Sequence, residues 1–298
     1  MTANFNIDSL LPPEMAHKAE TVGYNKAQAP VRYLFVLAIL AGAFIARGAM
    51  FATIAFSGNM PITAADGSQA FTTTLPYGIT RLLGGLVFSL GLILVIVGGA
   101  ELFTGNILII MAWASHRVSS RRLIRNWGIV YVGNFVGGGL TAALVFLSNH
   151  YLNGSGVIGL TALNIASSKA SLSFLPAVAS GILCNALVCL AVWLTYSARS
   201  TVDKILAIVF PITAFVAAGF EHSVANMYFL PFGLLVKNFA PAAFWELIGR
   251  SAADFSQLTW GAFFLKNLLP GTIGNIIGGG VLVAAVYWVA YLWKPKKN

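Results

Sequence analysis

The stretch Phe220-Glu221-His222-Ser223-Val224-Ala225-Asn226 interrupts an apolar run that is long enough to cross a membrane. Ionisable side chains at that depth are costly unless they line a cavity or have partners, so they mark candidate functional sites. His222 is the only histidine in the predicted spans, and an imidazole exchanges a proton near neutral pH. The stretch therefore predicts a helix that is broken inside the membrane, with His222 at the break.

The composition around this stretch is typical of a membrane protein. Of 298 residues, 58% are hydrophobic and 9% are charged, against roughly 25% charged residues in soluble domains. The net charge of +9 does not indicate nucleic-acid binding, because the basic residues concentrate in short loops beside the predicted spans. Cys184 and Cys189 point to different faces of one apolar helix, which favours two core thiols over a disulfide or a metal site.

Six regions have the roughly 20 apolar residues that a membrane span needs; they are 32–56, 78–115, 124–149, 172–198, 204–236 and 267–293. The second region is too long for one helix, since it would extend about 57 Å across a hydrocarbon core of about 30 Å. The fifth is also long, and both regions carry polar residues near their middle. We interpret both as broken helices; a long tilted helix with a polar kink is the alternative.

The charged loops predict the orientation. Basic residues concentrate in 116–125 and 199–204, while the loops 57–77 and 150–171 hold only Lys169. Because positive loops remain on the cytoplasmic side, both termini are predicted to be cytoplasmic. The chain then divides into an N-terminal segment 1–31, which has no signal peptide, a membrane domain 32–293 and a basic tail 294–298.

Two motifs occur in the same order in each half of the chain. Gly133-Asn134-Phe135-Val136-Gly137-Gly138-Gly139 matches Gly274-Asn275-Ile276-Ile277-Gly278-Gly279-Gly280, and Glu101-x4-Asn106 matches Glu221-x4-Asn226. Three spans per half require the second half to be inverted, and inverted repeats share a site near the membrane midplane. Glycine-rich runs also recur by chance in membrane helices, but the asparagine at the same offset favours a true repeat.

The N-terminal segment contains a predicted amphipathic helix that starts at Pro12-Pro13, since proline suits the first helical turn. Its pattern fits a helix lying on the membrane surface and a helix covering a pore mouth equally well.

The polar residues of the two breaks suggest a binding site without enzyme chemistry. For Glu101 and Glu221 we favour a structural role, accepting hydrogen bonds from freed backbone N–H groups or the nearby asparagine, over proton relay. Thr104 opens the second piece of a broken helix, where it can help to bind an anion, cap the helix, or do both. The sequence has no nucleophile elbow, zinc-binding His pair or phosphate loop, so no enzyme, cofactor or metal is predicted.

These motifs resemble the formate–nitrite transporter family, and within it the bacterial formate channels. The resemblance covers nearly the whole chain; it is carried by Gly98-Gly99-Ala100-Glu101-Leu102-Phe103-Thr104, by Gly219 to Met227, by Thr272 to Gly280 and by Leu10 to Ala16. It implies an all-α, aquaporin-like fold of six transmembrane helices in two inverted repeats, with the second and fifth broken. It also implies a homopentamer with one pore per protomer in the bacterial inner membrane.

The resemblance further implies roles for individual residues. Thr104 would face His222 at the centre, and the segment near 92–104 would form an Ω-shaped loop. The implied constrictions are Phe88 and Phe215 on the periplasmic side, and Leu92, Leu102 and Phe103 on the cytoplasmic side. Asn185 and Asn275 would line the pore, and Lys26 and Lys169 would draw anions to its two entrances. Glu221 and Asn226 would hold the surroundings of the histidine in place, with Glu101 and Asn106 as their counterparts in the first half. The N-terminal helix would gate the pore.

The implied function is a channel or proton-coupled transporter for formate or its acid, dependent on pH. His222 would either protonate the anion or remain charged and pair with it, and the sequence leaves both roles open. Nitrite and hydrosulfide are alternative substrates. A membrane regulator that senses pH through its N-terminal helix is the alternative of another class.

Overall fold

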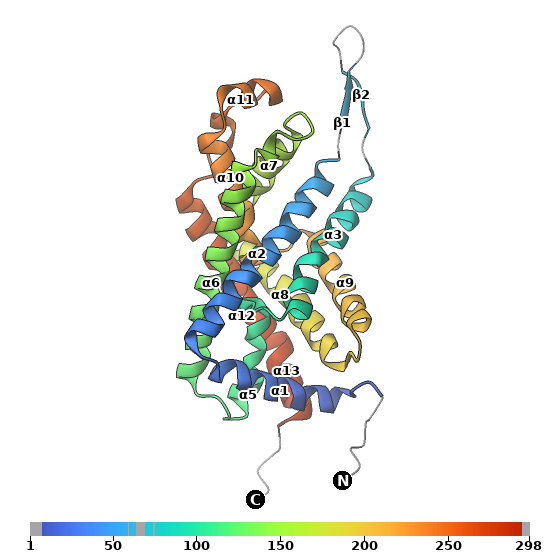
Figure 1. Cartoon of the computed structure of the whole chain (residues 1–298), viewed down its shortest axis with the longest axis vertical. Helices are drawn as coiled ribbons and strands as arrows, with labels where there is room; N and C mark the ends of the chain where they lie inside the picture. The colour runs from blue at the N-terminus through green and yellow to red at the C-terminus, as the bar shows by residue number, and fades with distance from the viewer. Residues whose placement is uncertain (1–7, 59, 64–68, 74, 294–298) are drawn as a thin grey trace, which may run out of the picture.

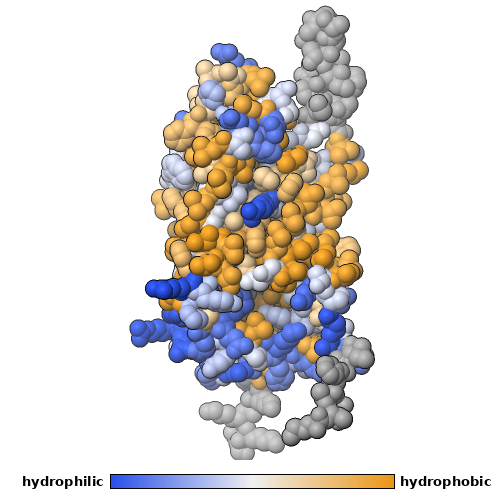
Figure 2. Space-filling model, in the orientation of Figure 1, coloured by the Kyte–Doolittle hydropathy of each residue, from blue (hydrophilic) through white to orange (hydrophobic). Residues whose placement is uncertain are grey.

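An apolar bundle of helices runs along the long axis of the molecule (Figure 1). The structure is a computed structural model that describes residues 8–58, 60–63, 69–73 and 75–293, so the predicted tail 294–298 lies outside the described residues. Six described helices are long and apolar enough to span a membrane: α2 (Val31–Phe56), α3 (Tyr77–Gly98), α6 (Ser120–Leu147), α8 (Phe174–Ser197), α9 (Thr201–Ala218) and the segment Ala262–Tyr291. The orange belt in Figure 2, with polar residues gathered at both ends, agrees with this assignment.

Both predicted helix breaks are present. α3 is capped at its C-terminus by Gly99, where φ is +77°, and the chain resumes as α4 (Phe103–Asn106), η1 (Ile107–Ile109) and α5 (Ile110–Ala114). α9 is capped by Gly219, where φ is +76°, and the chain resumes as α10 (Ser223–Phe239). A left-handed residue at a helix end favours glycine because a Cβ would be strained there. Each long apolar region is therefore two helices.

The inverted repeat also includes two short helices, α1 (Pro12–Gln28) and α7 (Val157–Ala170). Each precedes a span, and each carries near its end a lysine that reaches the glutamate of the following break. The prediction of a loop at 150–171 is wrong, since this connection contains η2 (His150–Leu152) and α7. With 14 residues, α7 extends about 21 Å, too short to cross the membrane.

The remaining elements complete the two ends of the bundle. The connection 57–77 contains an antiparallel hairpin of β1 (Met60–Thr63) and β2 (Gln69–Thr73). It lies at the same end as α11 (Ala242–Ile248), which is followed by η3 (Ala252–Phe255), whereas α1 lies across the opposite end (Figure 1). The last span joins two α-helical and two π-helical pieces: η4 (Ala262–Leu268), α12 (Leu269–Ile277), η5 (Gly278–Ala285) and α13 (Val286–Tyr291).

The repeated glycine motif allows two pairs of helices to cross with their backbones in contact. A Cβ added at Gly137 of α6 would lie 2.0 Å from the Ile39 carbonyl oxygen of α2. A Cβ at the equivalent Gly278 would lie 2.1 Å from the Ile182 carbonyl oxygen of α8. Small residues at such crossings let membrane helices pack closely, which explains why the motif recurs.

We expect Gly137→Ala to lower the free energy of unfolding by about 3 kcal/mol, because overpacking against backbone has no side chain to displace. Gly139→Ala is the matched control, since apart from the neighbouring backbone of its own helix no described atom lies within 4 Å of a Cβ built at Gly139. Thermal unfolding of the two purified variants in one detergent measures the difference. Equal unfolding temperatures would contradict the close crossing of α2 and α6.

Candidate functional site

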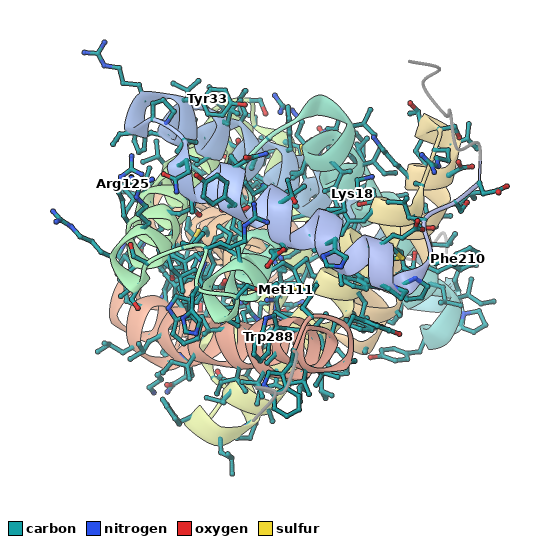
Figure 3. All side chains as sticks on the ribbon, turned by 90° about the horizontal axis from the view of Figure 1, so that it is seen from below. Lys18, Tyr33, Met111, Arg125, Phe210 and Trp288 are labelled. Carbon is teal, nitrogen blue, oxygen red and sulfur yellow. The ribbon has the colours of Figure 1, made fainter. Side chains whose placement is uncertain are left out.

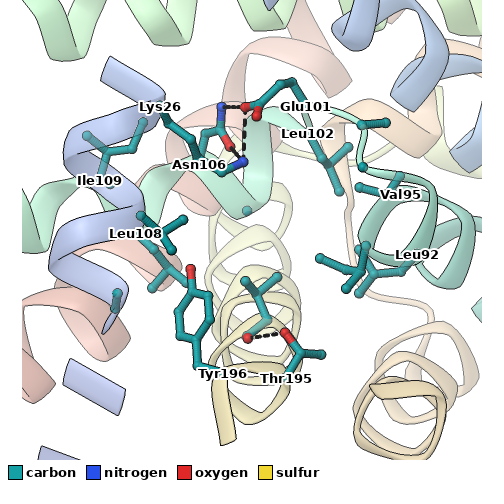
Figure 4. Close-up of a pocket in the computed structure, with 18 of the residues that line it drawn as sticks. Lys26, Leu92, Val95, Glu101, Leu102, Asn106, Leu108, Ile109, Thr195 and Tyr196 are labelled. Carbon is teal, nitrogen blue, oxygen red and sulfur yellow. Dashed lines mark hydrogen bonds and ion pairs between the residues drawn. The ribbon is translucent and has the colours of Figure 1, made fainter. Parts of the chain in front are cut away.

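Two cavities approach the centre of the bundle from opposite ends. The cavity at the end covered by α1 is called the inner vestibule; it has a volume of about 380 Å³ and reaches Leu92 and Leu102 (Figure 4). The cavity approaching from the opposite end is called the outer vestibule; it has a volume of about 440 Å³ and reaches Phe88, Phe215 and His222. These five side chains are each no more than 3% exposed, so the path between the vestibules is closed by mostly apolar groups.

Aromatic rings close the outer side of the centre. The rings of Phe88 and Phe215 meet edge to face with centroids 5.6 Å apart, and Phe215 stacks on the His222 ring at 5.6 Å. Phe103 packs instead against Tyr131, at 4.9 Å, and lines neither vestibule. The role of Phe103 in the inner constriction remains a prediction.

Thr104 and His222 meet at the centre. His222 Nε2 lies 3.0 Å from Thr104 Oγ1, and both side chains are buried. His222 is also the N-cap of α10, because its Nδ1 accepts a hydrogen bond of 3.0 Å from the Ala225 N–H. An Nδ1 that accepts leaves the proton of a neutral ring on Nε2, so Nε2–H donates to the threonine oxygen. In the register of the repeat, His222 corresponds to Leu102 and Thr104 to Val224. Each polar residue of the central pair is therefore replaced by an apolar residue in the other half.

Asn134 braces the first helix break. Its Oδ1 accepts a hydrogen bond from the Phe103 N–H at 2.9 Å, and its Nδ2 donates to the carbonyl oxygens of Glu101, at 2.9 Å, and Ala38, at 2.7 Å. Backbone groups freed at a break need such partners when they are away from water. Asn134 was not among the predicted site residues, although its place in the repeated motif was the available signal.

Asn275 braces the second break in the same way. Its Oδ1 accepts from the Ser223 N–H at 2.9 Å, and its Nδ2 donates to the carbonyl oxygens of Glu221, at 2.8 Å, and Gly181, at 2.9 Å. Asn275 is fully buried and lines neither vestibule. Lining of the pore by Asn275 therefore remains a prediction, whereas its hydrogen bonds to the backbone of the break are present in the structure.

Asn185 connects the centre to the last span. Its Nδ2 donates to the carbonyl oxygen of Asn275 at 2.7 Å and to that of Thr104 at 3.3 Å. The Cys189 thiol also reaches the Thr104 carbonyl oxygen, at 3.3 Å. Asn185 Oδ1 has no hydrogen-bond partner among the described residues. These contacts hold the backbone of Thr104, while lining of the pore by Asn185 remains a prediction.

Lys169 and Glu221 form the centre of a polar cluster at the outer side. Lys169 Nζ lies 2.7 Å from Glu221 Oε1, and Glu221 Oε2 accepts from Asn226 Nδ2 at 2.6 Å and from Asn267 Nδ2 at 2.8 Å. Asn267 also donates to the Lys169 carbonyl oxygen at 3.2 Å. Hydrogen bonds and an opposite charge together compensate a buried carboxylate.

The inner cluster repeats this arrangement (Figure 4). Lys26 Nζ lies 3.0 Å from Glu101 Oε2 and donates to Asn106 Oδ1 at 2.8 Å, and Asn106 Nδ2 donates to Glu101 at 2.7 Å. Asn126 accepts from Asn106 and donates to the Lys26 carbonyl oxygen, both at 3.0 Å. Asn126 and its counterpart Asn267 were not predicted as site residues, because each lies outside the repeated motifs; their equal offset of eight residues before Asn134 and Asn275 was the available signal.

Further cations surround the inner vestibule. Lys18 on α1, which crosses the end of the bundle in Figure 3, donates from Nζ to the Tyr196 carbonyl oxygen at 2.8 Å. Burial lowers the pKa of Lys18, and the positive charges of Arg199 and Lys204 lower that pKa further. Lys18 and Lys204 both line the vestibule, so this entrance carries positive charge beyond the paired Lys26.

The inverted repeats, the two broken helices and two vestibules that approach a buried polar pair from opposite ends define a multi-pass membrane protein of the channel and transporter class. A family model described as "Formate/nitrite transporter" matches residues 13–289. The chain belongs to the formate/nitrite transporter family. It is an inner-membrane protein of a transporter family rather than an enzyme.

Individual relatives are similar over nearly their full length. The chain is 47% identical over 292 residues to the formate channel FocA of Escherichia coli strain K12, with 98% of each chain covered. It is 39% identical to the formate channel FocA of Haemophilus influenzae, with 92% of each covered. A solved structure of a pentameric formate channel with formate bound has 42% identity and a TM-score of 0.79, covering 88% of this chain and 98% of that one.

Proposed function

We propose that this protein is a formate channel, and that each protomer of a homopentamer conducts formate through its own pair of vestibules. The observation that carries the proposal is the contact of Thr104 with His222, at 3.0 Å, between apolar constrictions. The identity of 47% to a formate channel and the similarity to a pentameric formate channel with formate bound support the substrate and the assembly.

The central pair suits a small carboxylate. The Thr104 hydroxyl and His222 Nε2–H are two donors on neighbouring atoms, and a carboxylate has two acceptor oxygens. A carboxylate that takes the place of the contact between these two side chains therefore gives each donor an acceptor.

The apolar constrictions favour passage as the neutral acid. Removing an anion from water without a partner has a penalty of several kcal/mol, and Phe88 and Phe215 offer no charge to offset it. A charged His222 would turn an Nδ1–H against the Ala225 N–H, which already donates to Nδ1. This geometry disfavours the charged ring and supports a third role beside the two left open above: a neutral ring that donates hydrogen bonds to a substrate protonated from vestibule water.

Both termini are proposed to lie in the cytoplasm. α1 and the end of the last span lie at one end of the bundle (Figure 1). The basic connections 116–125 and 199–204 adjoin α5, α6, α8 and α9 at that end, and positive loops remain cytoplasmic. The hairpin and α11 then face the periplasm. In this orientation α1 covers the cytoplasmic vestibule, which supports its predicted role in gating.

Flux through proteoliposomes tests the function. Wild-type protein is expected to carry formate down its gradient, faster as the pH falls, and to prefer formate over nitrite and acetate in competition. His222→Phe is expected to reduce the flux at least about tenfold, the equivalent of one lost hydrogen bond of about 1.4 kcal/mol. His17→Phe, at an exposed site on α1, is the control.

Three results would contradict the proposal or a part of it. If wild-type protein moves no small anion under any pH gradient, it is not a channel of this kind. If nitrite outcompetes formate, the substrate is wrong while the channel assignment holds. If His222→Phe leaves the flux as unchanged as His17→Phe does, His222 is not part of the pathway.

A further inference from the structure

We propose that Arg81 is the residue that attracts the anion into the outer vestibule, and that Lys169 is not. This inference rests on the proposed function, because it assigns the charge that concentrates the substrate at one entrance. It differs from the role that the family resemblance implies for Lys169.

The charge of Lys169 is already compensated. Among the described residues, the charged side chains lining the outer vestibule are Arg81, Lys169 and Glu221. The latter two form an ion pair of 2.7 Å, with side-chain exposures of 15% and 3%. Opposite unit charges at this separation largely cancel at the distance of an approaching ion. Releasing Lys169 to meet an anion would leave Glu221 buried and unpaired, which is strongly unfavourable.

Arg81 has no such partner. Its Nε donates to the Ala217 carbonyl oxygen at 3.0 Å and its Nη2 donates to the Val216 carbonyl oxygen at 2.6 Å. Its guanidinium lies 4.5 Å from the centroid of the Phe56 ring. No described carboxylate lies within 4.0 Å of Arg81. Its full positive charge therefore remains, reduced only by the partial negative charge of a helix C-terminus.

The position of Arg81 directs that charge at the pore. The carbonyls that it binds belong to the last turn of α9, directly before the break that leads to His222. Its Nη2 is so close to Gly219 that a Cβ there would lie 3.1 Å away. A guanidinium has five N–H donors, of which these contacts use two, so others remain for an anion. Arg81 is half-buried, where a charge in a cleft raises the local concentration of counter-ions.

The dependence of the formate flux on ionic strength distinguishes attraction of the anion by Arg81 from capping of α9 by Arg81. We expect Arg81→Gln to lower the initial formate flux on the order of threefold to tenfold at low formate and low ionic strength. At high ionic strength, where charges are screened within a few ångströms, the flux should approach that of wild type. Arg81→Lys should retain most of the flux. Arg250→Gln removes an exposed charge outside the vestibule and should change nothing.

A second variant leaves the contacts of Arg81 intact. Tyr77 is 79% exposed, lines the same vestibule and lies four residues before Arg81 on α3. Tyr77→Glu places a carboxylate at the spacing of a helical ion pair and should reproduce the salt-sensitive loss, whereas Tyr77→Gln should not. This pair decides the question if Arg81→Gln does not fold.

The inference is overturned if the Arg81→Gln loss is equal at low and high salt, if Arg81→Lys loses as much as Arg81→Gln, or if Tyr77→Glu and Tyr77→Gln behave alike. Each of these results would make Arg81 a helix cap only. Absence of formate flux in the wild-type protein would instead refute the proposed function, so the two failures are distinguishable.

Discussion

Asn275→Leu is expected to lower the free energy of unfolding by about 5 kcal/mol and to abolish formate flux. The leucine has a similar size, but it leaves the Ser223 N–H without an acceptor and the carbonyl oxygens of Glu221 and Gly181 without this donor. Each buried group left unpaired contributes about 1–3 kcal/mol. Thermal unfolding of the purified protein, measured together with flux, gives both effects.

The controls distinguish a brace from a pore-lining residue. Asn134→Leu removes the equivalent brace from the first break and should have a similar effect, while Asn238→Leu, at an exposed site, should have none. If Asn275→Leu loses flux but unfolds at the wild-type temperature, Asn275 acts on the substrate and does not hold the break.

Lys169→Met is expected to destabilise the protein by about 3–5 kcal/mol, because it leaves a buried carboxylate without its counter-charge. Glu221 is 3% exposed in its side chain, against 10% for Glu101 in the inner cluster, where Lys26 is 28% exposed. Lys26→Met should therefore be the milder change. Unfolding temperatures of the two single variants test this order.

The double variant Lys169→Met with Glu221→Gln is the control that decides this prediction. It removes both charges and retains an amide that accepts hydrogen bonds from Asn226 and Asn267, so it should recover most of the lost stability. With Arg81 intact, it should also retain the salt-dependent formate flux. A double variant that is no more stable than Lys169→Met would refute the pairing as the main role of Lys169.

Much of the scaffold was predictable because lipid imposes strict rules on a sequence. A span needs a long apolar run, so polar residues such as Glu101 and Glu221 inside such runs marked the breaks. The repeated asparagine and glycine residues revealed the inverted halves. The same length rule explains why α7 was not predicted, since its 14 residues fall below the length of a span. Its counterpart in the other half is α1.

The site was less predictable, because its contacts join positions that the repeat does not relate. Thr104 and His222 are 118 residues apart and occupy non-equivalent places in the two halves, so only the family resemblance suggested their contact. Asn126 and Asn267 complete the two clusters from positions outside the repeated motifs, although each stands eight residues before the motif asparagine of its own span. Two lysines that looked like free cations at the entrances are instead paired with acids on other elements.

The sequence alone determined that this chain crosses the membrane in two inverted halves with a polar break in each, because hydropathy and repetition are properties of residue order. Only the tertiary structure decided which charges remain unpaired, and therefore that Arg81 rather than Lys169 carries free charge at the outer vestibule. Ion pairing depends on distances of a few ångströms between distant segments, and these distances arise only when the two halves pack together.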